Sequence, residues 1–221
     1  MTIEGADLTF CDQLRQAAMN TIDINHNNRL ENELNFIIEI DKTKNILRKT
    51  KLFDGSRFEN DAEHSWTICV MALLLQKYSN FTVDIEKVIK MLLIHDIVEI
   101  DTGDTLVYSS AREGVKNDEK KAAERIFGLL DEDQKEYFIE LWIEFEAKET
   151  NEAKFAAVFD RLEPLIQNYI TEGYAWKNHN ITYDMIIEKN KHIENGSKEI
   201  WEFVLKLLEK ALSKGYIKTG M

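Results

Sequence analysis

The sequence has little of what marks a β-rich, secreted or membrane-spanning protein. Its 221 residues include one proline, nine glycines and two cysteines. These are few residues for hairpin turns, and two cysteines imply no disulfide framework. The amino-terminal stretch "MTIEGADLTF" lacks the basic and apolar segments of a signal peptide. No apolar run approaches the roughly 20 residues that span a bilayer. We therefore expect a cytoplasmic protein that does not associate with a membrane.

Positive charge is also scarce. The chain has 28 Lys and Arg against 40 Asp and Glu, a formal net charge of −12. Nucleic acids and anionic membrane surfaces attract basic faces, so this balance argues against a nucleic acid polymer as partner. A small phosphorylated substrate would need a cation close to its binding site.

Helical periodicity is what the sequence contains instead. Apolar residues make up 44% of the chain, and from residue 34 they recur at spacings of three and four, as on one face of an α-helix. This pattern predicts an all-α protein of about eight helices in one domain, residues 1–221. We expect an N-terminal extension over 1–30 with a short helix and a loop, a main body over about 34–170, and C-terminal helices over 171–221. The main helices are predicted over 34–49, 62–79, 84–100, 116–130, 131–149, 151–173, 182–193 and 197–214.

Local signals place several helix ends. Asp84 is a good N-cap, and Gly103 suits the position after a helix that ends near residues 101–102. Asp131 with Gln134 reads as a capping box. Pro164 lacks the N–H that would bond the carbonyl of Asp160, so the helix there is expected to bend. The segments over 62–79 and 84–100 are apolar almost all round, which predicts that both are central.

One predicted helix carries more charge than a buried helix should. The stretch "KMLLIHDIVEIDTGDT" places His95, Asp96, Glu99, Asp101 and Asp104 among apolar residues. Glu99 follows His95 by four residues and Asp96 by three, so it lies on the same helix face as both. Burying bare charges costs several kcal/mol unless something pairs with them. A divalent cation would supply that partner, because imidazole and carboxylate together suit a transition metal.

Two more residues extend the cluster. An adjacent His-Asp pair alone is more often structural than functional. Here, however, "NDAEHSW" places His64 near the start of another buried helix, and "AAVFDRLEPLI" places Asp160 inside a third apolar segment. His64, His95, Asp96 and Asp160 are therefore candidate ligands of one divalent metal ion. Mixed nitrogen and oxygen ligands leave Mn, Co, Fe, Ni, Zn and Mg open.

The order of these residues resembles the HD-domain phosphohydrolase superfamily, and within it the small bacterial and eukaryotic 5′-deoxynucleotidases. The stretches "ENDAEHSW", "HDIVEIDTGD" and "ELWIEFEAKETNEAKFAAVFDRLEPL" carry the resemblance over roughly residues 34–170. It implies an all-helical HD domain, one divalent ion on His64, His95, Asp96 and Asp160, and hydrolysis of a phosphomonoester. It also implies that Glu99 and Asp104 act near the attacking water and the leaving oxygen.

The candidate substrate contacts depart from the family in one place. The deoxynucleotidases carry an Arg-Trp pair before the first ligand histidine, where this chain reads Arg48-Lys49-Thr50. The cation is kept and the aromatic side chain is not, so the sequence does not specify a preference for deoxyribose. Arg48, Lys49 and Arg57, which precedes His64 by seven residues, are the candidate phosphate contacts. The alternative role for Arg57 is a surface salt bridge.

The leading hypothesis is therefore a metal-dependent phosphohydrolase acting on a small phosphomonoester, such as a (deoxy)nucleoside 5′-monophosphate. The alternatives are an alarmone or other nucleotide pyrophosphohydrolase and a non-catalytic sensor or scaffold with a structural metal. A homodimer is expected from the family likeness and from the aromatic-rich stretches "YFIELWIEF" and "IWEFVLKLL". Tyr108 is a candidate pocket residue, and His192 is expected to be exposed.

Overall fold

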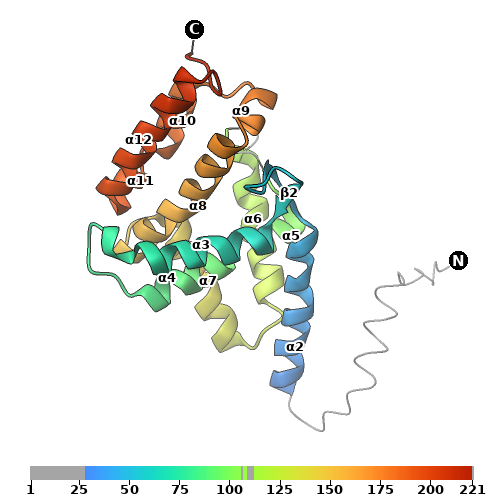
Figure 1. The fold of residues 1–221 in the computed structure, drawn as a ribbon. Coiled ribbons are helices and arrows are strands. Elements are labelled where there is room, and N and C mark those ends of the chain that lie inside the picture. Colours follow the sequence, from blue (N-terminus) through green and yellow to red (C-terminus); the bar gives the residue numbers. More distant parts are fainter. Residues whose placement is uncertain (1–27, 106, 109–111, 221) are drawn as a thin grey trace, which may run out of the picture.

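The computed structural model of the protein describes residues 28–105, 107–108 and 112–220, and these form helices with one small hairpin (Figure 1). The predicted all-α class is confirmed. The short helix expected before residue 30 lies largely outside the described residues. The first described helix, α2 (Asn28–Ile40), begins before the predicted end of the extension.

The helix predicted over 34–49 is wrong beyond Ile40. The next five residues form the 3-10 helix η1 (Asp41–Asn45), none of which is buried, because the sequence DKTKN offers no apolar side chain to the core. The chain then enters β1 (Leu47–Lys51), which pairs antiparallel with β2 (Phe58–Asn60). The register of this hairpin is irregular between its two ends. The hairpin brings Arg48 beside Asp61, the first residue of the next helix.

The two segments expected to be central are α3 (Asp61–Leu75) and α4 (Ile85–Ile94), separated by η2 (Gln76–Tyr78). Both pack against α8, and they bury Ile68, Met91 and Leu92 completely. Asp84 caps α4 as predicted, since its Oδ1 accepts from two backbone amides of the first turn. The outer face of α3 is not buried, and large apolar side chains lie exposed along it.

The third predicted helix is broken at its charged residues. α4 ends at Ile94, residues 95–98 form turns, and α5 (Glu99–Thr102) follows. Backbone amides here bond to carbonyls three residues earlier, as for Ile97 to Ile94 and Glu99 to Asp96. The carbonyl of His95 instead accepts a hydrogen bond from the indole of Trp142. The predicted end before Gly103 is confirmed, and Gly103 has a φ of +71° that favours glycine.

The second half of the chain supplies the remaining helices. They are α6 (Arg112–Phe127), α7 (Glu132–Ala147), α8 (Asn151–Ile170), α9 (Tyr174–Asn178), α10 (Tyr183–Asn190), α11 (Ile193–Gly196) and α12 (Lys198–Ser213). Asp131 holds the N-cap position of α7, but the predicted capping box is wrong. Its carboxylate accepts from Asn32, and Gln134 donates to Glu33. Tertiary partners on α2 have therefore replaced the local cap.

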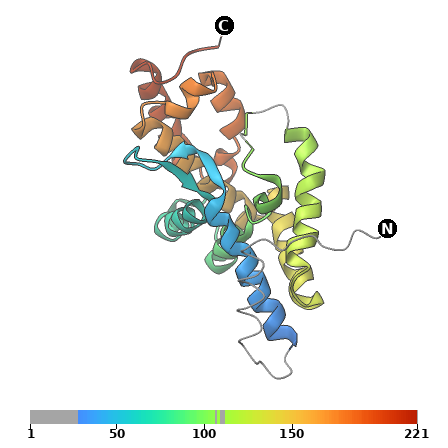
Figure 2. The ribbon, with the colours of Figure 1, turned by 90° about the vertical axis from the view of Figure 1, so that its right-hand side faces the viewer.

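Helix α8 is the centre of the arrangement. It packs against α3, α4, α7, α11 and α12, and the two views agree that α10–α12 lie at the opposite end of the molecule from α2 (Figures 1 and 2). One cluster of buried apolar residues runs from Phe36 to Ile217. Across the described helices, none combines the length and the hydropathy needed to cross a bilayer.

Candidate metal centre

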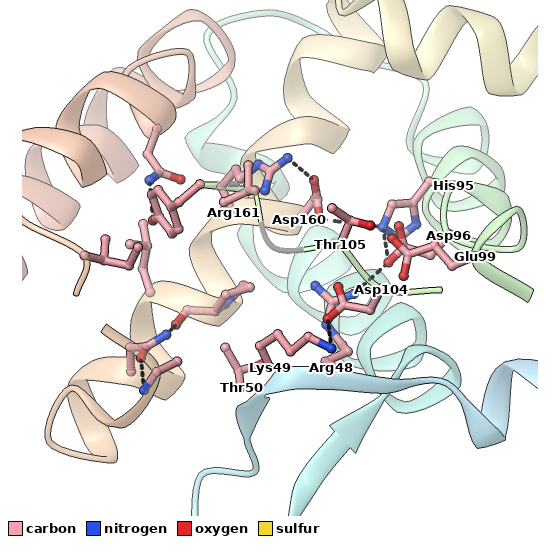
Figure 3. Close-up of a pocket in the computed structure, with 18 of the residues that line it drawn as sticks. Arg48, Lys49, Thr50, His95, Asp96, Glu99, Asp104, Thr105, Asp160 and Arg161 are labelled. Carbon is pink, nitrogen blue, oxygen red and sulfur yellow. Dashed lines mark hydrogen bonds and ion pairs between the residues drawn. The ribbon is translucent and has the colours of Figure 1, made fainter. Parts of the chain in front are cut away.

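Three separate elements bring the predicted ligands together. His64 lies in the first turns of α3, which begins with a complete capping box between Asn60 and Glu63. His95 and Asp96 lie in the turn after α4, and Asp160 lies midway along α8. Figure 3 shows His95, Asp96 and Asp160 turned toward one another. Because the helix is broken after Ile94, the two adjacent residues can both reach the same point.

Four donor atoms converge on that point. His95 Nε2 lies 3.1 Å from Asp96 Oδ2 and 3.7 Å from Asp160 Oδ1. His64 Nε2 lies 3.8 Å and 3.5 Å from the same two oxygens. All four ligand atoms lie within 4.8 Å of one another. Two imidazole nitrogens and two carboxylate oxygens in such a cluster are a donor set for a divalent transition metal.

The hydrogen bonds of the two imidazoles fit a metal better than they fit a simple ion pair. His64 Nδ1 is bonded to Glu163 Oε2, and His95 Nδ1 lies 2.8 Å from the carbonyl oxygen of Leu92. Both Nε2 atoms are buried and have no hydrogen-bond partner. A metal-ligating histidine ordinarily donates one ring N–H to a carboxylate or carbonyl and leaves the other nitrogen to the ion. The residues present therefore fit a bound divalent cation.

The electrostatics of the cluster favour a positive charge among these four side chains. Burial works against charge, yet Asp96 and Asp160 more than offset it and raise the pKa of His95 to about 10. The pKa values of Asp96 and Asp160 are lowered well below the ordinary value despite burial, the first chiefly by His95 and the second by Arg161 and the two histidines. Both carboxylates are therefore ionised over the physiological range, as a cation requires.

Arg48 reaches the same cluster from the hairpin. Its Nη1 lies 2.8 Å from Asp96 Oδ2 and 3.5 Å from Asp61 Oδ1, and its Nε lies 3.8 Å from Glu59 Oε2. Burial opposes the charge, but the surrounding acids keep the pKa of Arg48 above its ordinary value. Burial and Asp96 in turn raise the pKa of Asp61 to about 7. Arg48 thus neutralises a group of buried acids.

The two predicted catalytic acids lie beside the cluster. Glu99 and Asp104 both line the pocket (Figure 3), and each has a buried carboxylate oxygen without a hydrogen-bond partner. Burial, followed by Asp96 and Asp61, raises the pKa of Glu99 well above its ordinary value. Burial also raises the pKa of Asp104, whose Oδ2 lies 3.8 Å from Lys49 Nζ. Both acids therefore hold a proton more readily than an exposed carboxylic acid does.

The pocket continues away from the charged cluster, with an empty volume of about 870 Å³ that includes its open mouth. Its far wall comes from α8, α9 and α10. Asn168 accepts from the backbone amides of Ala175 and Trp176, and Asn190 donates to the hydroxyl of Tyr108. Tyr108 thus lines the pocket as predicted.

Arg57 is the candidate that the structure does not bring to the site. Its guanidinium makes two hydrogen bonds to the carboxylate of Glu63, at 2.6 and 2.7 Å, and it does not line the pocket. It is a surface salt bridge. His192 was also predicted wrongly, because it is largely buried rather than exposed.

Sequence reasoning missed several charged residues around the cluster. Glu163 supports His64, Glu59 and Asp61 surround Arg48, and Arg161 lies against Asp160. The signal for Glu163 was present, because it is an acid in the same apolar segment as Asp160. Nothing local distinguishes Arg161 from a solvent-exposed arginine.

Several known proteins are similar to this chain. A family model described as "HD domain" matches residues 40–201. The 5′-deoxynucleotidase HDDC2 of Danio rerio is 30% identical over 150 residues, 67% of this chain and 74% of that protein. The Homo sapiens protein of the same name is 26% identical, over 61% of this chain and 65% of its own length. A crystal structure of a predicted metal-dependent phosphohydrolase from Magnetospirillum magnetotacticum is 48% identical, with a TM-score of 0.83, and the match covers 86% of this chain and 96% of that one.

Proposed function

The chain belongs to the HD-domain family, and from that premise we propose that it is a metal-dependent phosphohydrolase that cleaves a small phosphomonoester, most simply a (deoxy)nucleoside 5′-monophosphate. The observation that carries the proposal is the buried pair of imidazoles whose Nε2 atoms lack partners while their Nδ1 atoms are held. The names of the relatives supply the substrate class.

His64, His95, Asp96 and Asp160 would hold one divalent ion. When bound, such an ion supplies positive charge that polarises a phosphoryl oxygen and activates water. We leave the metal open among Mn, Co, Fe, Ni, Zn and Mg, because all of them accept mixed nitrogen and oxygen ligands to differing degrees.

Glu99 and Asp104 carry the proton transfers in this mechanism. Between them they take a proton from the attacking water and return one to the leaving 5′-oxygen. Both are pocket residues with a raised pKa and a carboxylate oxygen that lacks a hydrogen-bond partner, which suits a group that both takes up and releases a proton. Lys49, which is near Asp104, adds a cation at the mouth of the pocket.

The rest of the pocket accounts for a substrate larger than phosphate. Its far wall carries Trp176 and Tyr108, which offer an apolar and aromatic surface to a sugar or base. The residue at position 50 is threonine, so the aromatic side chain of the deoxynucleotidase pattern is missing there. Hydrolysis of a pyrophosphorylated nucleotide remains the second enzymatic candidate.

A substrate screen tests the proposal. Nucleoside monophosphates, their deoxy counterparts, sugar phosphates and guanosine tetraphosphate should be assayed with each metal in turn. We expect release of inorganic phosphate from a monophosphate. Release of pyrophosphate from guanosine tetraphosphate would favour the second candidate, and no turnover with any metal would favour a non-catalytic metal protein.

We also propose that two copies of the chain associate. The aromatic stretch of α7 offers less surface for this, since Leu141, Trp142 and Phe145 are buried and its exposed large apolar side chains are Tyr137 and Ile143. Exposed apolar side chains gather instead on the outer face of α3, where Trp66 is 68% exposed and Leu74 is 72% exposed, and such a face favours protein contact. Light scattering should give a dimer mass that Trp66→Glu reduces. A monomer mass for the unmodified protein at micromolar concentrations would exclude the dimer. A cytoplasmic location stays a prediction.

A further inference from the structure

Two arginines face the pocket, and their surroundings differ. Arg48 forms ion pairs with Asp96, Asp61 and Glu59, so acids of the protein already balance its charge. Arg161 lies on α8 next to Asp160, and Figure 3 shows it beside that aspartate and apart from Arg48 and Lys49. The second arginine therefore approaches the charged cluster from another side.

Arg161 has few partners of its own. Among the described residues it forms an ion pair with Asp160, whose Oδ2 lies 3.4 Å from Arg161 Nη2. The other oxygen of that carboxylate, Oδ1, faces the Nε2 atoms of His64 and His95. The guanidinium Nε of Arg161 is buried and has no hydrogen-bond partner. Its side chain is only 13% exposed, and it lines the pocket.

Lys148 also lines the pocket. It ends α7 in a left-handed conformation, with φ of 53° and ψ of 36°, and its amide bonds to two carbonyls of the last helical turn. A residue with a Cβ takes this conformation at a cost of about 1 kcal/mol, and here it turns the chain so that a lysine borders the pocket. The depressed pKa of His192, after burial, is owed to Arg161 and then Lys148, which indicates that the positive field of both extends through this part of the molecule.

The pairing of Arg161 would change once a divalent ion is present. Asp96 and Asp160 together balance the two charges of such an ion. Asp160 would then ligate the ion, which weakens the ion pair between Asp160 and Arg161. The guanidinium of Arg161 would still line the pocket. A planar guanidinium with free N–H groups is the side chain best suited to a phosphate.

We propose that Arg161, together with Lys148, holds the phosphoryl group of the substrate, whereas Arg48 serves to neutralise the buried acids. This inference rests on the proposed function for the identity of the anion. It assigns substrate contact to a residue that directly follows a metal ligand in sequence, so that one turn of α8 supplies both the ligand and the anion contact.

Binding of inorganic phosphate to the metal-loaded protein tests the inference without turnover. Titration calorimetry should be run on the unmodified protein, Arg161→Gln, Arg161→Lys and Arg57→Gln, with metal content measured on each preparation. We expect Arg161→Gln to keep its metal and to lose about tenfold or more in phosphate affinity, the scale of a hydrogen bond to a charged group. Arg161→Lys should recover part of that loss. Arg57→Gln is the matched control, because that arginine lies outside the pocket, and it should bind as the unmodified protein does.

Steady-state kinetics add a second readout. In Arg161→Ala, added guanidinium ion should restore part of the lost kcat/KM, since the cavity left behind matches its shape. Phosphate affinity equal to that of the unmodified protein in Arg161→Gln would overturn the inference. Loss of the metal in both Arg161→Gln and Arg161→Lys would also overturn it, because the arginine would then only support Asp160. If phosphate binding depends on Arg161 but no monoester is hydrolysed, the proposed function fails and the anion site stands.

Discussion

The two ends of the pocket are built in opposite ways. At the charged end, polar atoms of His64, His95, Glu99 and Asp104 are buried without hydrogen-bond partners. At the far end, Asn168 donates to the carbonyl of Pro164 at 2.9 Å while its oxygen accepts from two backbone amides. Asn190 likewise donates to the carbonyl of Ile186 and to a tyrosine hydroxyl.

The difference indicates that the charged end of the pocket serves the reaction and the far end sets the shape of the pocket. A buried polar atom without a partner costs about 1–3 kcal/mol, so several of them at one place indicate that a ligand completes the site. Satisfied amides make a wall whose geometry is already set before anything binds. The charged end should therefore control reaction and metal affinity, and the far end should control stability and the fit of the substrate.

Removing a ligand should have the largest effect. We expect His95→Ala to lose the bound ion and all phosphatase activity, and chelation of the unmodified protein to do the same. An ion present at 1,000 times its Kd stabilises the native state by about 4 kcal/mol, so both samples should also melt at a lower temperature. Elemental analysis and thermal unfolding measure the two effects. Full metal content in His95→Ala would show that the ligands lie elsewhere.

The acids beside the cluster should affect rate alone. Glu99→Gln and Asp104→Asn are expected to keep the metal and the melting temperature and to lose about 10²-fold or more in kcat, the usual scale of a general acid or base. Asp101→Asn is the control. It alters an acid of the same short helix that is paired with Arg125 instead, and its rate should stay near that of the unmodified protein.

A substrate with a good leaving group separates the two roles. An aryl phosphate needs little protonation of its leaving oxygen, so it should restore the rate of the general-acid variant and leave the general-base variant slow. If both variants hydrolysed the substrate at the rate of the unmodified protein, the proposed mechanism would be wrong. Loss of metal in either one would make that residue a ligand.

The chemistry of the charged end could be predicted from short motifs, and its surroundings could not. His95, Asp96, Glu99 and Asp104 lie within ten residues, so one helix turn and one loop decide where they are. The hairpin was missed because LRKTK and FEN are too short to show alternation, and Ile46 and Leu47 continue the helical spacing of the segment before them. Because Arg48 lies in the first strand of this hairpin, the sequence did not predict the backbone that positions it.

The arginines show why the rest of the site was beyond the sequence. Spacing does not say which way a long side chain points. Arg57 bonds to Glu63, six residues later, whereas Arg161 lines a pocket whose other walls come from segments distant in the chain. Likewise, Asp131 was predicted to cap its own helix, but Asn32 took its carboxylate. Tertiary partners decided each case.

At the far end, Asn168→Ala should lower stability rather than metal content. The change leaves the amides of Ala175 and Trp176 without their acceptor, at a cost of about 1–2 kcal/mol in the free energy of unfolding. We expect KM to rise because Trp176 loses its support, while the ion stays bound. Denaturant unfolding and elemental analysis measure these effects. An unchanged stability would mean that another contact orders this wall.

The smallest expected effect is a pH dependence of the free energy of unfolding that comes from His192. Burial, with Arg161 and Lys148 nearby and Asp160 opposing them, lowers the pKa of His192 to about 4, against about 6.5 in an unfolded chain. Above pH 6.5 neither state is protonated, so the histidine adds no pH dependence. Below it the unfolded state takes up a proton first, and the free energy of unfolding falls until about pH 4.

His192→Gln should therefore reduce the loss of stability between pH 7 and pH 5.5 by about 1 kcal/mol. Urea unfolding of both proteins at the two pH values gives this difference, and the other titrating groups cancel in it. Identical pH dependence in the two proteins would show that His192 is protonated as readily in the folded state.

The distribution of the candidate ligands along the chain has a consequence for the lifetime of the protein. They come from α3, from the turn after α4 and from α8, so an ion held by all four ties together segments that are far apart in sequence. Such a tie closes long loops and opposes the partial opening through which proteases reach a folded chain. A chain that loses its ion would open more often and be degraded sooner. The metal supply of the cell would then set how many copies of the protein persist, in addition to how many are active.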